Sequence, residues 1–319
     1  MKTDLLLAIV LIVCLAGAIG VTRGLTQHRR DPAHHSGEAQ LYLDGRSARR
    51  LSLAFNGLAA DWYWMRSLQY VGGKVVQYED EHNGQFDLTS LSTLDLPLLP
   101  SLLDVTTTLD PQFIPAYEYG AVILPETNPA AAIALLNKGI AANPSSWRLH
   151  QHLGYIYWQR KDYARASEVY EAGAKLPAAP AWVTAMAARM KAEGGSRTAA
   201  RAMYQRLSES SQDPAVQKMI EYQLESLDSL DERDVIRQEL EKFRQRTGHC
   251  VKLWRDIAPE LEAAKIETNW DIDSSQPSVR GYYTFKFRDG APLDPSGIPY
   301  RLINDGCDVD LDPTSKVPR

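Results

Sequence analysis

Apolar residues run without a break from Leu5 to Val21, with charged residues on either side. As a helix, this run would be about 25 Å long, slightly shorter than the hydrocarbon core of a bilayer. A cleaved signal peptide is the alternative, because Lys2 and the small residues 16–18 fit its two ends. Apolar residues continue on both sides of that point, however, and no polar segment precedes it. We therefore predict an uncleaved transmembrane anchor over residues 1–22.

Residues 23–48 are polar and predict a tether, after which apolar residues recur at every third or fourth position. That spacing predicts a helix over residues 49–70 with one buried face. With a second helix over Leu98–Leu109, it would form a divergent N-terminal repeat over residues 49–112. Residues 71–90 lie between the two helices and predict an insertion, either a disordered excursion or a loop that contacts a partner. The apolar positions of the first helix are Leu51, Phe55, Leu58, Trp62 and Met65.

Aromatic residues are frequent in the later part of this first helix, at Trp62, Trp64 and Tyr70. In one interpretation they pack against the next repeat. In the other they contact the membrane surface or a membrane-embedded subunit, because they lie close in sequence to the predicted anchor. Tryptophan and tyrosine are enriched at the boundary between bilayer and water.

Small and aromatic residues recur at an interval of 34 through the middle of the chain. A small residue at such a position lets two helices approach closely, while an aromatic residue fills the space around the contact. An interval of this length is typical of a helical repeat protein. The matching positions are Gly120 and Gly154; Ala132, Ala166 and Ala200; Leu136, Tyr170 and Tyr204; and Gly139 and Gly173.

The copy from Trp147 to Pro180 shows the pattern most clearly. Leu153-Gly154, Tyr157, Ala166 and Tyr170 occupy positions at which it resembles the tetratricopeptide-repeat (TPR) family. The resemblance implies pairs of antiparallel helices that stack into a solenoid, with three copies over residues 113–212.

The remaining segments complete a mostly α-helical fold. In the first TPR copy, Pro125 and Pro129 are expected to end the first helix early. Residues 213–247 predict a charged capping pair of helices, Pro214–Leu227 and Glu232–Arg246. Residues 248–319 form a C-terminal extension, in which alternating residues over Ile298–Leu311 predict a β-hairpin. The fold class is thus a transmembrane helix, a TPR α-solenoid and a small C-terminal β-hairpin or irregular segment.

The TPR resemblance also implies a binding surface, because the first helices of the repeats line a concave groove. Groove contacts in the family come from the second, fifth, ninth and twelfth positions of a repeat. Packing between neighbouring repeats is the alternative role for the aromatic residues among them. The corresponding residues here are Tyr117, Arg148, Gln151, Tyr155, Trp158, Trp182 and Arg189.

Charge and motifs exclude other classes of function. A net charge of -5, without a basic stripe, argues against nucleic-acid binding. The glycine-rich loops and the metal-binding or nucleophile motifs of the common enzyme classes do not occur, so we expect neither catalysis nor a cofactor nor a metal. Asp308, Asp310 and Asp312 alternate along the predicted strand; they are either a solvated face or oxygen ligands for calcium.

The three cysteines bear on the compartment. Cys14 lies inside the predicted anchor, whereas Cys250 and Cys307 lie outside it and are a candidate disulfide pair. A disulfide persists in an oxidising compartment, which favours an extracytoplasmic soluble part on a bacterial inner membrane. The positive-inside count, taken by itself, would keep that part in the cytoplasm.

These features together predict a membrane-anchored TPR scaffold that binds other proteins, in envelope assembly, secretion or a membrane complex. The alternative is a structural accessory subunit of an integral membrane protein complex.

Overall fold

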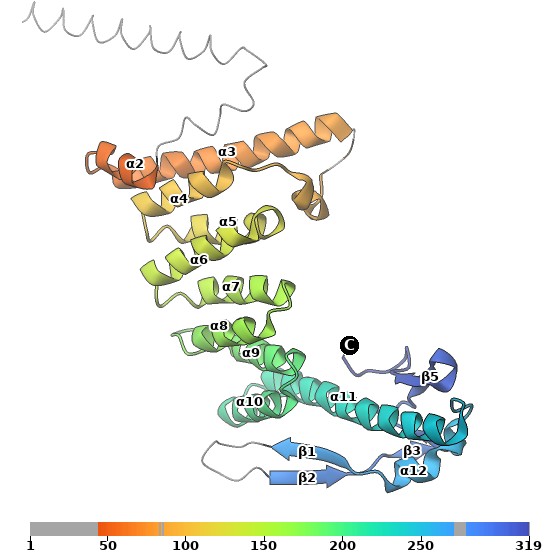
Figure 1. Ribbon diagram of the computed structural model, residues 1–319. Coiled ribbons are helices and arrows are strands. Elements are labelled where there is room, and N and C mark those ends of the chain that lie inside the picture. The colour runs from red at the N-terminus through yellow and green to blue at the C-terminus, as the bar shows by residue number, and fades with distance from the viewer. Residues whose placement is uncertain (1–43, 83, 85, 271–278, 319) are drawn as a thin grey trace, which may run out of the picture. The chain divides into compact units, whose positions relative to one another are not determined.

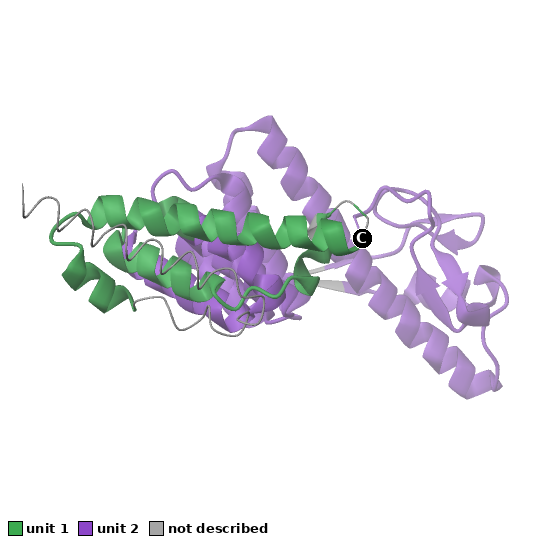
Figure 2. Ribbon diagram, turned by 90° about the horizontal axis from the view of Figure 1, so that it is seen from above, with its two compact units in different colours: residues 1–116 green, residues 117–319 purple. Residues whose placement is uncertain are grey.

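The computed structural model describes residues 44–82, 84, 86–270 and 279–318 (Figure 1). The predicted anchor, most of the predicted tether and Cys14 lie outside these residues. None of the helices in the described part of the chain combines the length and the hydropathy that a membrane span requires. The described part is mostly helical, and its strands lie near the C-terminus. The chain divides into two compact units, residues 1–116 and 117–319 (Figure 2).

The first unit is built from a short helix, a long helix and a third helix that packs against both. They are α2 (Gly45–Leu51), α3 (Asn56–His82) and α4 (Leu99–Leu109), with the 3-10 helix η2 (Leu88–Thr93) before α4. The Asp44 carboxylate caps α2 by accepting hydrogen bonds from the backbone N–H groups of Arg46 and Ser47, both at 3.0 Å. The core of this unit includes Ala60, Tyr63, Leu98, Leu102 and Val105.

Two predictions for this unit are wrong. The helix expected over residues 49–70 is divided between α2 and α3, because the chain turns at Leu53 and Ala54, whose φ angles are 47° and 76°. The insertion expected over residues 71–90 is helical as far as His82, since α3 continues through it. Gly72 and Gly73 lower helix propensity, yet α3 crosses both without a break.

The prediction of which helix face is buried is also wrong. Leu51, Phe55, Leu58, Trp62 and Met65 are each more than half exposed. The buried side of α3 instead carries Ala60, Tyr63, Ser67 and Val71. This side includes the small residues Ala60 and Ser67, both fully buried, which allow α3 and α4 to pack closely.

The second unit begins within α5 (Ile114–Thr127) and continues with five helices connected by short turns. These are α6 (Pro129–Ala142), α7 (Trp147–Gln159), α8 (Tyr163–Ala174), α9 (Ala181–Glu193) and α10 (Arg197–Ser210). Helices α6, α8 and α10 begin at Pro129, Tyr163 and Arg197, so that successive starts are 34 residues apart. Asn128 and Asp162 cap α6 and α8 by accepting backbone N–H bonds of 3.0 and 3.2 Å.

Helix α5 does not end early at Pro125, contrary to expectation. Pro125 lies inside the last turn of α5, which continues to Thr127. A proline at this position removes the intrahelical bond to the carbonyl of Ala121, and α5 extends only two residues beyond it. The helix therefore reaches 14 residues, comparable with the 13 of α7.

Glycines facing aromatic rings bring consecutive helices of this unit together. A Cβ atom on Gly154 would lie 2.7 Å from ring atoms of Tyr170, and one on Gly139 would lie 2.7 Å from the ring of Tyr117. Gly173 faces His150 in the same way, at 2.8 Å from its Cβ. These distances are shorter than van der Waals contact, so only glycine fits with the rings in place. Gly173 near the end of α8 lies against the first turn of α7, which shows that the two helices run antiparallel.

Helix α11 (Pro214–Thr247) is continuous, which corrects the predicted pair of capping helices. Asp213 caps its start and Gly248, in the left-handed conformation, ends it. The segment between Leu227 and Glu232, which was expected to break the helix, contains no glycine or proline.

Arginines of α10 form ion pairs with the acidic residues in the middle of α11. Arg201 is almost fully buried, and its guanidinium pairs with Asp228 and Asp231, both at 2.6 Å. Arg197 pairs with Asp231 and Asp234, both at 2.7 Å. A buried arginine requires such partners, since an unpaired charge in the interior is strongly destabilising.

The C-terminal extension packs on α11 as a small module, and its strand β1 also contacts α10. It contains η3 (Trp254–Asp256), α12 (Ala258–Ala263) and three antiparallel strand pairs. The pairs are β1 (Ile266–Trp270) with β2 (Val279–Tyr283), β3 (Phe287–Arg288) with β4 (Ala291–Pro292), and β5 (Arg301–Ile303) with β6 (Asp308–Asp310).

The hairpin predicted within Ile298–Leu311 is confirmed, with Leu302 opposite Val309 and the turn at Asn304–Gly306. The core of the module combines Ile236 and Leu240 of α11 with residues of the extension such as Tyr300 and Val309. Cys250 and Cys307 form a disulfide with their Cα atoms 5.0 Å apart, which connects the end of α11 to this hairpin.

Candidate protein-binding surface

Side chains of α7 and α9 meet at both ends of these two helices, which run in the same direction, and α8 packs against both helices. At their starts, the rings of Trp147 and Trp182 meet edge to face with centroids 5.7 Å apart. At their ends, Trp158 Nε1 donates a hydrogen bond of 3.0 Å to Glu193. The two helices therefore form one surface to which both contribute side chains.

An aromatic and arginine cluster lies at the C-terminal end of this surface, formed by Tyr155, Trp158, Arg189 and Glu193. The Arg189 guanidinium lies 5.2 Å from the centre of the Trp158 ring and donates a bond of 2.7 Å to Glu193. The rings of Tyr155 and Trp158 are 5.5 Å apart. Because Arg189 contacts both an aromatic face and a carboxylate, its orientation is fixed before any partner binds.

A second aromatic group lies at the N-terminal end of the same two helices. Arg148 stacks on Trp147, with its guanidinium carbon 5.2 Å from the ring centre. Trp182 contacts Trp147 and is 40% exposed, nearly the same as the 41% of Tyr155. Tryptophan, tyrosine and arginine contribute most to binding energy at protein interfaces. Both ends of the surface thus present residue types suited to binding a protein.

A hollow of about 390 Å³ adjoins the cluster. It is lined by Pro125, Glu126, Pro129, Ile156, Gln159 and Arg160. The Gln159 side-chain amide lies 3.4 Å from the Tyr155 hydroxyl, so the hollow and the cluster share an edge.

Six of the seven residues predicted to contact partners lie on α7 or α9. Arg148, Tyr155 and Trp182 are exposed, while Gln151, Trp158 and Arg189 are half-buried. The prediction that Tyr117 contacts a partner is wrong, because its ring is fully buried against Gly139.

Glu193 and Trp147 were missed, although each has a signal in the sequence. Glu193 follows Arg189 by four residues on one helix, the spacing of a surface ion pair. Trp147 and Trp182 are 35 residues apart, close to the repeat interval, which places both at the start of a first helix.

The three aromatic residues predicted to contact the membrane or a subunit differ in their surroundings. Trp62 is exposed, and the Arg66 guanidinium lies 5.7 Å from its ring centre. Trp64 is half-buried against Phe113, at 5.7 Å between ring centroids. Tyr70 is half-buried against the core of the first unit. Of the three, only Trp62 has most of its surface available for a partner.

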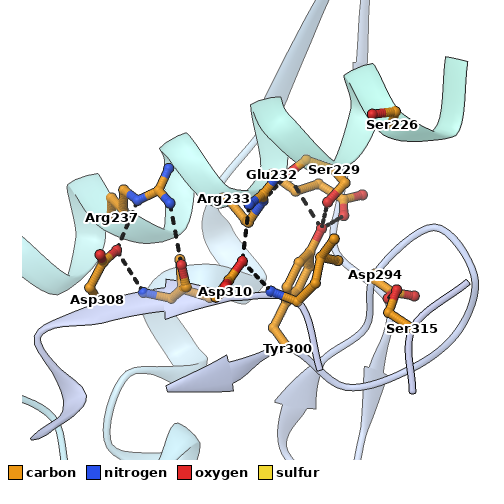
Figure 3. Close-up of polar contacts among 12 residues, drawn as sticks. Ser226, Ser229, Glu232, Arg233, Arg237, Asp294, Tyr300, Asp308, Asp310 and Ser315 are labelled. Carbon is orange, nitrogen blue, oxygen red and sulfur yellow. Dashed lines mark hydrogen bonds and ion pairs between the residues drawn. The ribbon is translucent and has the colours of Figure 1, made fainter. Parts of the chain in front are cut away.

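The aspartates of β6 make ion pairs to α11. Asp308 pairs with Arg237 at 2.8 Å, and Asp310 pairs with Arg233 at 3.2 Å (Figure 3). They are therefore neither a purely solvated face nor a set of converging ligands. Within the described ranges, no group of three or more His, Cys, Asp or Glu side chains is placed to hold a metal ion.

A buried carboxyl group lies where the C-terminal module meets α11. The Tyr300 hydroxyl donates a hydrogen bond of 2.7 Å to Glu232 and lies 3.0 Å from Ser229 Oγ (Figure 3). Burial raises the pKa of Glu232 to about 7, although hydrogen bonds from Tyr300 and Tyr283 oppose the shift. Perturbed carboxyl groups often mark catalytic sites, but this one lies inside a packed core and holds two segments together.

No model of a known protein family matches the sequence, and no curated protein is similar to it.

We expect the stability of the C-terminal module to fall as the pH rises from about 4.5 to 7. In that window Glu232 ionises in the unfolded chain while the folded protein keeps its proton, so the folded state binds more protons. The difference between about 7 and the ordinary value of 4.5 corresponds to about 3 kcal/mol. Glu232→Gln keeps an acceptor for Tyr300 and removes this contribution.

Denaturant unfolding of the full chain at a series of pH values measures the effect. The wild type should lose stability relative to Glu232→Gln as the pH rises through this window. The exposed control Glu168→Gln should follow the wild type at every pH. Parallel curves for the wild type and Glu232→Gln would show that Glu232 ionises normally in the folded protein.

Proposed function

We propose that this chain is a membrane-anchored scaffold of the TPR type that binds a protein segment across α7 and α9. The observation that carries the proposal is the surface shared by these two helices, with an oriented aromatic and arginine group at each end. Its resemblance to the TPR family rests on the sequence pattern of Trp147–Pro180. The interval of 34 residues between successive second helices supports the same assignment.

The chemistry of the surface favours a peptide with aromatic or aliphatic side chains. Arg189 is balanced by Glu193, so the cluster carries little net charge, and the rings of Tyr155 and Trp158 lie beside this ion pair. Arg148, at the other end, is exposed and offers donors to a carboxylate or a backbone carbonyl of the partner. We propose binding without catalysis, since the sequence contains none of the common catalytic motifs.

The proposed location is a bacterial inner membrane, with the apolar run Leu5–Val21 as the anchor and the soluble part outside the cytoplasm. The Cys250–Cys307 disulfide supports this orientation, since cytosolic reductants keep most thiols reduced. Envelope assembly, secretion and membrane complexes are the settings that such an arrangement suits.

A photo-reactive phenylalanine analogue at Tyr155 should crosslink the full-length protein to a partner in the cells that produce it. Trp158→Ala together with Arg189→Ala should weaken the capture about tenfold or more, because truncating one interface anchor costs 1 kcal/mol or more. Mass spectrometry of the crosslinked band identifies the partner.

The matched control is the same analogue at Glu168, an exposed position on α8. Circular dichroism of the double variant checks that its helices are intact. Equal crosslinking from Tyr155 and Glu168, or capture unchanged in the double variant, would count against this surface as the binding site.

An impermeant thiol reagent tests the orientation. In intact cells, Cys250 and Cys307 should react only after an impermeant reductant opens their disulfide, because the oxidised pair has no free thiol. A double variant with serine at both positions should not react, which assigns the signal. Labelling that appears only in lysed cells, and there without reduction, would place the soluble part in the cytoplasm.

A further inference from the structure

Helix α3 is apolar on two opposite sides. Its buried side, with Ala60, Tyr63 and Ser67, packs in the core of the first unit. Leu58 and Met65 lie about 180° around the helix from that side, at about 100° per residue. A helix on the surface of a soluble domain normally carries polar residues there.

We define the exposed apolar stripe as Leu51, Leu53, Phe55, Leu58, Trp62 and Met65. Each of these side chains is more than half exposed. Phe55, Leu58, Trp62 and Met65 follow one another at intervals of three and four, so these four lie on one side of α3. Single apolar residues on a surface are common, whereas large exposed apolar patches are typical of interaction sites.

The turn between α2 and α3 contributes Leu53 to the stripe, and its backbone is strained. Leu53 and Ala54 have φ angles of 47° and 76°, in the left-handed region that residues with a Cβ atom rarely adopt. A residue with a Cβ atom is strained in this region. Burial of the Leu53 side chain does not offset this strain, because that side chain is 79% exposed. The turn therefore presents Leu53 to the solvent in the part of the chain that the structure describes.

The charges beside the stripe identify the kind of surface that it fits. Arg46, Arg49 and Arg50 are exposed on α2, at the end where the stripe begins. Among the acidic residues of α3, Asp61 lies on the same side as the stripe, three residues after Leu58 and four before Met65, and Glu79–Glu81 lie in the last turns. Large apolar residues with tryptophan on one face and arginines beside them are typical of helices that lie in a bilayer interface. Arginines near an anionic leaflet add electrostatic attraction to such binding.

The position of the stripe in the chain brings it within reach of a membrane. Val21 and Gly45 are 24 residues apart, so α2 cannot lie more than about 85 Å from the end of the apolar run. We propose that the exposed apolar stripe lies in the interface of the same bilayer that holds the anchor. The stripe would enter between the headgroups of anionic lipids, with α3 parallel to the membrane plane. This inference rests on the proposed anchor.

Nitroxide labels on the full-length protein in vesicles test the proposal. In a Cys14→Ser background, which keeps the Cys250–Cys307 disulfide, single cysteines are introduced as Leu58→Cys and Met65→Cys. The protein is reconstituted in vesicles of equal parts phosphatidylglycerol and phosphatidylcholine. Collision rates with oxygen, which concentrates in lipid, and with a water-soluble nickel chelate are then measured.

The matched control is Gln77→Cys, an exposed position on the same helix about a quarter-turn from the stripe. The ratio of oxygen to nickel collisions should be several-fold higher at Leu58→Cys and Met65→Cys than at Gln77→Cys. A high nickel rate at all three positions would show that the stripe is in water and overturn the proposal. Low rates with both reagents at the stripe would show a protein contact, either a subunit or a second copy, and would also overturn it.

An alkaline carbonate wash of the same vesicles separates this proposal from that of the anchor. If the protein stays on the vesicles after the wash and the stripe is in water, the proposal of the anchor stands and the proposal of the stripe is wrong. If the wash releases the protein, and the collision ratio before the wash favoured oxygen at the stripe, the proposal of the anchor is wrong. The stripe then remains as a peripheral membrane contact.

Discussion

The fold of the second unit depends on glycines that let aromatic rings lie between neighbouring helices. Gly154 receives the ring of Tyr170, and Gly139 receives the ring of Tyr117. Both rings are almost fully buried, so each contributes a large apolar area to the core. Burial also raises the pKa of Tyr170 to about 12. A side chain in place of either glycine would separate the helices and change the spacing of everything that packs on them.

This spacing is what makes α7 and α9 a joint surface. With α8 packed closely against both helices, the ends of α7 and α9 come near enough for Trp147 to meet Trp182 and for Trp158 to reach Glu193. Glycine contacts inside the unit thus determine the distances between the residues proposed to bind a partner. The C-terminal module is held differently, by ion pairs, a buried Glu232 and a disulfide on α11, and so depends on pH and redox state as well as on packing.

The sequence predicts much of the helical pattern, because a repeat interval and capping residues are local signals. The sequence fails to predict burial or helix length where these depend on side chains from a distant segment that pack against the residue. For α3, the periodicity identifies an apolar face correctly, but it cannot show that the small residues Ala60 and Ser67 lie against the core and leave Leu58 outside. For α11, the repeat pattern predicts a pair of helices, because it does not show that Asp228 and Asp231 pair with Arg197 and Arg201, which are distant in sequence. Tyr117 occupies a position associated with a binding groove, yet the space beside Gly139 holds its ring inside the protein.

A double-mutant cycle between Gly154→Ala and Tyr170→Leu, followed by denaturant unfolding of the full chain in mild detergent, measures the glycine contact most directly. Gly154→Ala should cost about 1 to 3 kcal/mol in the wild type, because the added carbon overlaps the ring. In the Tyr170→Leu background the ring is absent, so the cost should fall by about 1 kcal/mol or more. Gly72→Ala, with no atom within 4 Å of the added carbon, serves as the control and should have the same effect in both backgrounds. An equal cost of Gly154→Ala in the two backgrounds would contradict the account.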